Sequence, residues 1–91
     1  MPKRIQRVIF KYGLRIADIQ VVFMPDQAEI LSVAAQDGKL CLWAIVNPES
    51  EKVDRHIEII DTGSSMPSVE RIFLGTVLMP PFVWHVFEFF P

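Results

Sequence analysis

The sequence predicts an all-β protein, built as a small antiparallel barrel or sandwich of about seven short strands. Short apolar or alternating segments follow one another along the chain, and turn-forming residues separate them. No segment carries the 3.6-residue period of an amphipathic helix. With 91 residues, of which 51% are hydrophobic and 22% charged, the chain suits a single domain over residues 1–91 and is too apolar to stay disordered.

The central element of this prediction is the segment 39–46. It lies between two turn signals, Asp37-Gly38 and Asn47-Pro48, and is apolar at almost every position. Such a short apolar run is typical of a strand that is buried on both faces. The Asp-Gly pair before it predicts a tight hairpin, because these residues accept the positive φ angles of two-residue turns.

Three strands are expected before this central one. Residues 5–12 alternate between two faces, and Gly13 ends the segment. Residues 19–24 form an apolar run that stops at Pro25, since proline cannot donate to a sheet ladder. Residues 30–35 lead directly into the Asp-Gly hairpin.

Three more strands are expected after it, separated by two loops. The polar stretch 47–54 predicts a solvent-exposed loop, and the serine-rich stretch 61–68 predicts a second one. Gly75 weakens the strand that contains it, and Pro80-Pro81 ends that strand. The predicted strands are residues 55–60, 71–79 and 82–90.

Charge and hydropathy exclude two classes of partner and indicate a compartment. The formal net charge is −2, which gives no long-range attraction for nucleic acid. No apolar run approaches the roughly 18–20 residues that span a bilayer, so no membrane partner is expected. The single cysteine, Cys41, cannot form an internal disulfide, and this fits the reducing cytoplasm. At mid-strand we interpret it as a buried core residue.

Asp61-Thr62-Gly63 follows an apolar segment, as the motif of aspartic proteases does. The chain after it has neither a glycine-rich flap nor a second motif of the required kind. No nucleophile with a base and no acid–base pair assembles elsewhere in the sequence, so we expect a protein that is not an enzyme and has no catalytic residue.

The same loop has two interpretations. Turn amides and hydroxyls can cradle a phosphate, and arginines can clamp it, but the same residues are also typical of an ordinary surface loop. The candidate ligand residues are Thr62, Gly63, Ser64 and Ser65, flanked in sequence by Arg55 and Arg71.

Aromatic and histidine side chains complete the candidate binding site. Tyr12 and Trp84 could stack on a base, although tryptophan in small β domains mostly fills the core. His85 either bonds neighbouring groups as a structural histidine or lines a ligand pocket. The soft metal ligands Cys41, His56 and His85 lack any local spacing signature, so neither a metal nor a cofactor is expected.

The last predicted strand carries more large apolar groups than one face can bury. They are Phe82, Val83, Trp84, Val86, Phe87, Phe89 and Phe90. Large exposed apolar patches usually mark interfaces, so this C-terminal strand predicts a homo-oligomer.

Several segments, in order, resemble a family of small phage and prophage proteins. They are Lys11-Tyr12, Ile30-Leu31-Ser32-Val33, Leu42-Trp43-Ala44 with Val46 and Pro48, Thr62-Gly63, Gly75-Thr76-Val77 and Val83-Trp84-His85-Val86-Phe87-Glu88. The closing Trp-His-Val-Phe-Glu is the most specific of them. The resemblance implies a phage accessory protein that acts in the cytoplasm of the host bacterium.

Three functions agree with this resemblance. The first is counter-defence, in which the protein sequesters a nucleotide-derived immune signal of the host. This signal would be a nucleotide second messenger, bound by the candidate ligand residues named above. The second is inhibition of a host defence enzyme or effector through an apolar protein-interaction surface. The third is a structural or assembly role.

Overall fold

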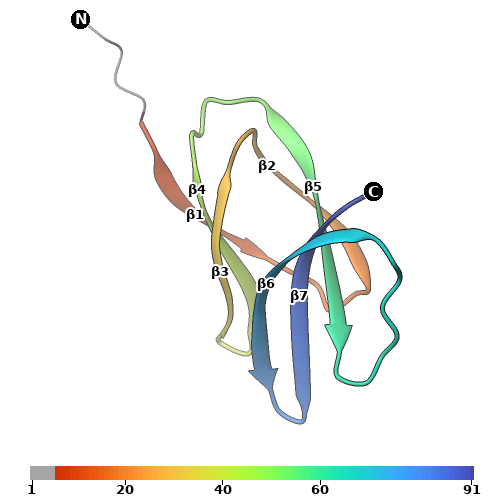
Figure 1. The fold of residues 1–91 in the computed structure, drawn as a ribbon. Coiled ribbons are helices and arrows are strands. Elements are labelled where there is room, and N and C mark those ends of the chain that lie inside the picture. The colour runs from red at the N-terminus through yellow and green to blue at the C-terminus, as the bar shows by residue number, and fades with distance from the viewer. Residues whose placement is uncertain (1–5) are drawn as a thin grey trace, which may run out of the picture.

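Residues 6–91 are described by the computed structural model, and they form seven strands arranged in two antiparallel sheets (Figure 1). The strands are β1 (Val8–Gly13), β2 (Ile19–Pro25), β3 (Glu29–Gln36), β4 (Lys39–Val46), β5 (Lys52–Asp61), β6 (Glu70–Met79) and β7 (Phe82–Phe90). One sheet has the order β1-β4-β3 and the other the order β2-β5-β7-β6. The all-β prediction is confirmed, and of its two forms the structure is the sandwich, not a closed barrel.

Strand bounds agree with the prediction where turn residues define them. The ranges of β4 and β7 are those predicted, but β5 begins at Lys52 and not at residue 55. The predicted loop 47–54 is therefore shorter, because Lys52 pairs with Pro25 and Val53 pairs with Met24 across the sheet. The predicted start of the first strand, residue 5, lies outside the described residues.

The Asp37-Gly38 hairpin has the predicted geometry. Both residues have positive φ, 52° and 75°, as a two-residue turn between right-twisted strands requires. The turn joins β3 to β4, with Gln36 opposite Lys39. The hairpin pairs β4 with β3, and β1 pairs with the other edge of β4, so β4 lies at the centre of its sheet.

The hydrophobic core lies between the two sheets. From β4 the even-numbered residues face it, and Leu42 and Ala44 have no exposed surface. From the other sheet it receives alternate residues of β2, β5 and β7, including the fully buried Met24, Ile57 and Val86. Alternation along each strand thus gives both sheets one buried face.

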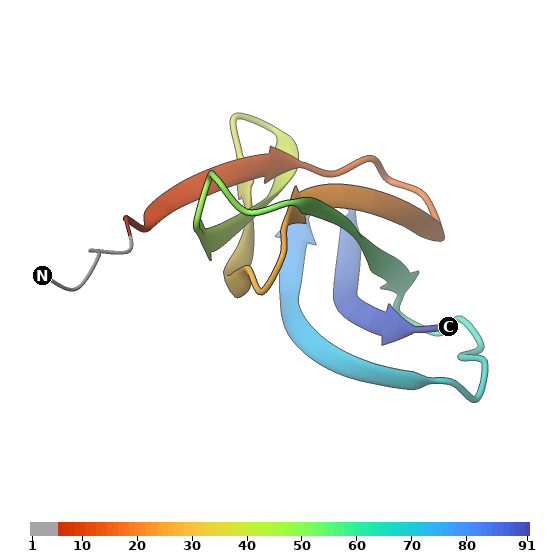
Figure 2. The same ribbon diagram turned by 90° about the horizontal axis from the view of Figure 1, so that it is seen from above.

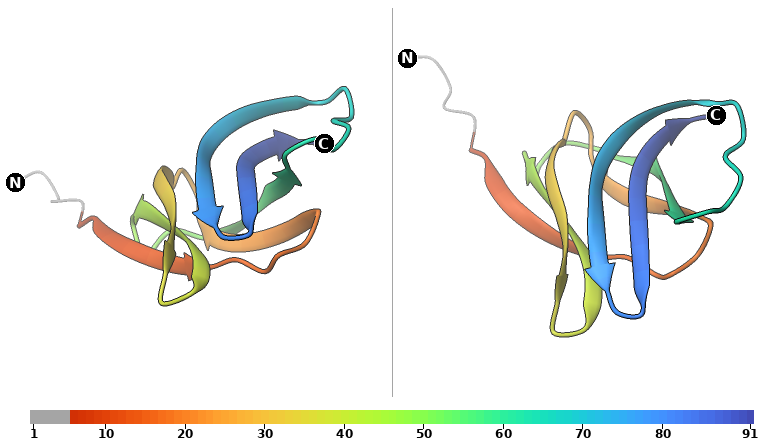
Figure 3. Two further views of the ribbon diagram at one scale, coloured as in Figure 1. Left: turned by 90° about the horizontal axis from the view of Figure 1, so that it is seen from below. Right: turned by 60° about the horizontal axis from the view of Figure 1, so that its bottom comes forward.

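β6 and β7 bend strongly halfway along their length, as Figures 2 and 3 show. The bend coincides with a bulge between Phe73 and Gly75, and bulges commonly bend strands. At this point β6 approaches β3 so closely that a Cβ atom on Gly75 would lie 2.7 Å from Cγ2 of Val33. The β3–β4 and β6–β7 turns consequently lie side by side at one end of the sandwich (Figures 1 and 3).

The C-terminal strand β7 lies inside its sheet, between β5 and β6. Both of its edges are therefore paired within the chain. Phe89 is buried, whereas Phe82 and Phe90 at the two ends of the strand are about half exposed. A second copy of the chain could therefore contact β7 only at these two ends or on its partly buried outer face.

Candidate functional site

The nine residues predicted to bind a ligand fall into four separate places. Thr62, Gly63, Ser64, Ser65, Arg71 and His85 lie on or beside the loop between β5 and β6, Arg55 lies on the other face of the sheet, and Tyr12 lies in the other sheet. Trp84 lines a cavity at the turn end of the sandwich. The structure therefore does not bring the predicted set together into one site.

The loop after β5 begins with a turn that uses its own polar groups. The Ser64 amide donates to the Asp61 carbonyl oxygen over 3.2 Å, and the Ser64 hydroxyl donates to the Asp61 carboxylate. Gly63 supplies a φ of +94°, which L-residues rarely adopt. These are the bonds of a turn that follows a strand.

His85 ties this loop to the sheet. Its Nε2 atom lies 2.8 Å from the Thr62 hydroxyl and its Nδ1 atom lies 3.0 Å from the Thr76 hydroxyl. Both ring nitrogens are thus hydrogen-bonded within the chain, which is the geometry of a structural histidine.

Arg71 is paired with a buried carboxylate. Its Nε and Nη2 atoms donate to the two oxygens of Glu58 over 2.8 and 3.3 Å, and Nη2 also donates to the Pro67 carbonyl over 2.9 Å. The guanidinium carbon lies 5.6 Å from the centre of the Phe87 ring. The arginine thus links the loop to the outer face of β5 and β7.

Arg55 is paired in the same way on the opposite face. It makes a two-pronged ion pair with Glu88, and its Nη1 atom donates to the Ala28 carbonyl over 2.8 Å. The hydrogen bond with Glu88 raises the pKa of Arg55. Arg55 shares the face of Ile57 and Ile59, which is the core face, so it cannot reach the anion that Arg71 would hold.

The cavity beside the loop is acidic. It measures about 320 Å³, and its lining includes Asp18, Glu58 and Asp61 together with Ser64 and Ser65. Neither arginine lines it. Carboxylates repel a phosphate, so this cavity does not favour an anionic ligand.

Tyr12 lies on β1, where its ring meets Phe10 edge-on at a centroid distance of 6.5 Å. Burial raises the pKa of the Tyr12 phenol above its ordinary value of 10.0. This position is in the three-stranded sheet, whereas the loop with the predicted phosphate ligands belongs to the other sheet.

Alkaline titration should show this effect, because Tyr12 is the one tyrosine of the chain. Folded protein should form tyrosinate, followed by ultraviolet absorbance, at higher pH than protein in denaturant. Since the folded state holds its proton more tightly, the free energy of unfolding should fall as the pH rises above 10.0. Equal midpoints in the folded and denatured states would contradict the prediction.

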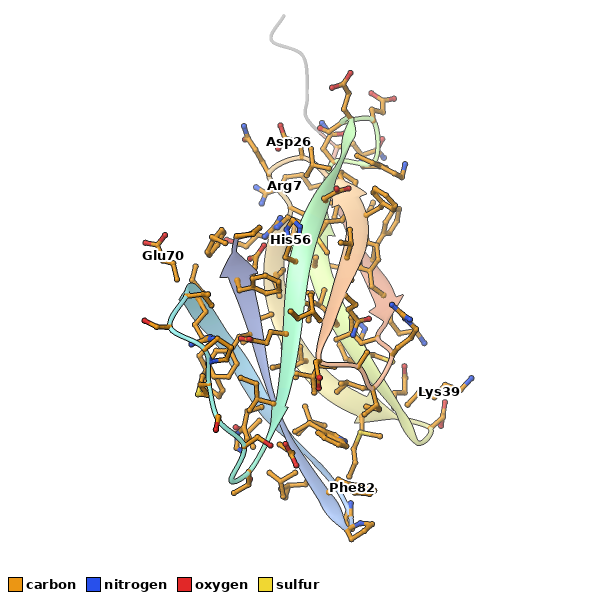
Figure 4. All side chains as sticks on the ribbon, turned by 90° about the vertical axis from the view of Figure 1, so that its right-hand side faces the viewer. Arg7, Asp26, Lys39, His56, Glu70 and Phe82 are labelled. Atoms are coloured by element: carbon orange, nitrogen blue, oxygen red, sulfur yellow. The ribbon has the colours of Figure 1, made fainter. Side chains whose placement is uncertain are left out.

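An apolar cavity of about 610 Å³ opens at the turn end of the sandwich. It is lined by Ile16, Ala35, Gly38, Leu78, Met79, Pro80, Phe82 and Trp84. The Phe82 and Trp84 rings stack at 5.2 Å with an angle of 18° between them. Figure 4 shows Phe82 at this end of the molecule, opposite the end that carries Asp26 and Arg7.

Three side chains of the cavity wall are more than half exposed. Leu78 keeps 69% of its surface exposed, Phe82 keeps 54% and Ile16 keeps 51%. No charged residue lines the cavity. It is therefore a wide apolar opening with an aromatic wall.

Of the residues that line this cavity, the sequence predicted Trp84 as a ligand residue and Phe82 as part of an apolar interface strand, but none of the others. The lining residues come from the β1–β2 connection and from two hairpin turns that are far apart in the chain. Both turns are marked in the sequence by Asp37-Gly38 and Pro80-Pro81, but nothing in either signal places the turns next to each other.

Two properties concern residues 6–91 as a whole. No group of three or more histidine, cysteine, aspartate or glutamate side chains among them could hold a metal ion. This part of the chain also contains no helix that is long and apolar enough to cross a membrane.

Comparison with known proteins gives one match. A family model with the description "Domain of unknown function (DUF7352)" matches residues 5–89. No curated protein and no solved structure matches the chain.

Proposed function

We propose that this chain, which belongs to the DUF7352 family, is a non-enzymatic protein that binds another protein through the apolar cavity at its turn end. The observation that carries the proposal is the cavity itself. Its volume of about 610 Å³ and its uncharged wall suit large apolar side chains. Stacked aromatic residues such as Phe82 and Trp84 are typical of the side chains that dominate protein interfaces.

A protein partner fits this cavity better than a small molecule does. Pockets for small molecules usually enclose most of the ligand surface. Here Leu78 and Phe82 line the cavity, and more than half of the surface of each is exposed to solvent. A partner that covers these two residues while inserting a side chain between them would bury both the wall and the cavity.

The polar side chains that could take part in catalysis are buried or already hydrogen-bonded within the chain, and this supports a binding role without catalysis. Cys41 is 4% exposed, and both ring nitrogens of His85 are bonded to threonine hydroxyls. Arg55 and Arg71, the charges expected to hold a nucleotide, are each paired with a buried glutamate. Nucleotide capture stays a prediction, and no contact in the structure favours it.

The resemblance to phage proteins adds a class of partner to the proposal. In this reading the bound protein is a host defence enzyme or effector, and the encounter takes place in the cytoplasm of the host bacterium. The structural or assembly role stays a prediction of the same kind, and it would use the same cavity for a different protein.

Selection from a random peptide library tests the proposal. The folded chain would be the bait, and a Leu78→Asp variant, whose charge lies at the cavity wall, would be the bait for counter-selection. We expect the enriched peptides to share large apolar side chains and to bind the parent chain at least tenfold more tightly than the variant. Ile72→Asp is the matched control, because Ile72 is 54% exposed but does not line the cavity.

Two results would overturn this function. One is a peptide set that binds the parent chain and Leu78→Asp equally well. The other is a rise in melting temperature with a cyclic or ADP-ribose-type nucleotide that disappears in Arg71→Ala, which would establish nucleotide capture instead.

A further inference from the structure

The sandwich leaves four strands at the edges of its two sheets, and one of them has neither a charged residue nor a bulge to prevent pairing. These edge strands are β1, β3, β2 and β6. β3 and β6 each contain a bulge and a charged residue, and they approach each other closely at Gly75 and Val33. β1 carries Lys11. Charges, prolines and bulges are devices by which proteins prevent edge pairing, and β2 has only one of them, Pro25 at its C-terminal end, which leaves Ile19 to Met24 unprotected.

The free edge of β2 has a defined set of backbone groups. The Ile59 amide donates to the Asp18 carbonyl over 3.0 Å, and the Asp26 amide donates to the Glu51 carbonyl over 2.7 Å. Even-numbered residues therefore turn their backbone groups towards β5. The amides and carbonyls of the odd-numbered residues Ile19, Val21 and Phe23 consequently point to the free edge.

The same three residues form an exposed apolar row on the outer face. Ile19 is 57% exposed, Val21 is 46% exposed and Phe23 is 63% exposed, and no charged residue interrupts the strand. Apolar side chains and free backbone groups thus lie together at one edge. In Figure 4 β2 lies in front, beside β5.

We propose that β2 pairs with β2 of a second copy of this chain, in antiparallel orientation about a two-fold axis at Val21. In this register Val21 lies opposite the partner's Val21, and Ile19 lies opposite the partner's Phe23. Each such pair can exchange two backbone hydrogen bonds, and every member of the apolar row meets another apolar side chain. The two four-stranded sheets then become one continuous sheet.

Self-complementarity is the reason for choosing a second copy as the occupant. A row that reads Ile, Val, Phe in one direction presents Phe, Val, Ile to its own reversed copy, so the larger Phe23 is always matched by the smaller Ile19. Moving the axis by one residue to Val22 would place Asp18 opposite the partner's Asp26, and like charges in opposition are destabilising. The axis at Val21 avoids that contact. The proposal is independent of the proposed function, since none of the three residues lines the apolar cavity.

Sedimentation of the full chain at micromolar concentration tests the dimer. The parent chain should have twice the 10.5 kDa mass of one copy, and Val21→Lys should have the mass of one copy, because two lysines would meet at the axis. Val21 is exposed in the single chain, so the variant should keep its circular dichroism spectrum. Ile9→Lys is the matched control, since Ile9 is 60% exposed on the edge strand β1, and it should remain dimeric.

Cysteine cross-linking tests the register. Under mild oxidation Val21→Cys should form a covalent dimer, because the two α-carbons would be about 5.5 Å apart, within reach of a disulfide. Ile19→Cys should not, because its two copies would be separated by about four residues, roughly 13 Å. The native Cys41 is 4% exposed and should leave the parent chain uncross-linked. A monomeric parent chain, a dimer that survives Val21→Lys, or efficient cross-linking through Ile19→Cys would overturn the proposal.

Discussion

Replacing Glu88 with leucine should lower the free energy of unfolding by about 3 kcal/mol, because it leaves the Arg55 guanidinium in the core without its counter-charge. The Arg55 side chain is only 19% exposed and that of Glu88 only 8%. Urea unfolding followed by circular dichroism, at one protein concentration, measures the change. Glu70→Leu is the matched control on the neighbouring strand, where the glutamate is exposed, and its effect should be within about 0.5 kcal/mol.

The double variant Arg55→Met/Glu88→Leu separates the charge from the packing. Two apolar side chains of similar length leave no buried charge, so most of the lost stability should return. If Glu88→Leu costs less than about 1 kcal/mol, the guanidinium reaches water by itself and the ion pair does not matter for stability. If the double variant is no more stable than the single one, the loss comes from packing at position 88.

Gly75→Ala should destabilise the protein by about 1–2 kcal/mol, because the new Cβ atom would lie 2.7 Å from Cγ2 of Val33. Val33 is β-branched and stiff, so its γ-carbon cannot simply swing away. The contact is the point where β3 of one sheet meets β6 of the other. Gly13→Ala is the control, since a Cβ atom there has no neighbour within 4 Å, and it should be close to neutral.

A double-mutant cycle identifies Val33 as the obstacle. In a Val33→Ala background the γ-carbons are gone, and Gly75→Ala should then cost almost nothing. The two changes should therefore be coupled by about 1–2 kcal/mol. Additive effects would mean that the backbone of β6, and not the contact with Val33, requires glycine at this position.

Local patterns predicted the strands because their causes are local. Turn residues defined the ends of β4 and β7, and the Asp37-Gly38 pair predicted its hairpin from the φ angles that these residues accept. Alternation along β5 places Ile57 and Ile59 on one face, and both are buried. Each of these signals depends only on neighbouring residues and on the two-residue repeat of a strand.

Pairing between distant strands was not predictable in the same way. β5 extends to Lys52 because β2 pairs with it along the whole length of β2, a contact that no turn signal predicts. The sequence also suggested Gly75 as a weak point of a strand, whereas in the structure it is the position that lets the two sheets approach.

For the candidate site too, local features were predictable from the sequence and long-range contacts were not. Arg55 and Arg71 looked available for a phosphate, but Glu88 lies 33 residues from Arg55 and Glu58 lies 13 residues from Arg71, and both carboxylates were paired by the fold. The apolar cavity likewise depends on two turns that are remote in the chain.

By itself the sequence determined that this protein is made of short strands, where most of them end, and which side chains share a face, since a pleated backbone and its turns obey short-range steric rules. Only the tertiary structure decided which charges neutralise each other, where the surface opens into an apolar cavity, and which strands lie at the edges of the sheets. Those outcomes depend on which strands lie side by side, and that is set by contacts summed over the whole core.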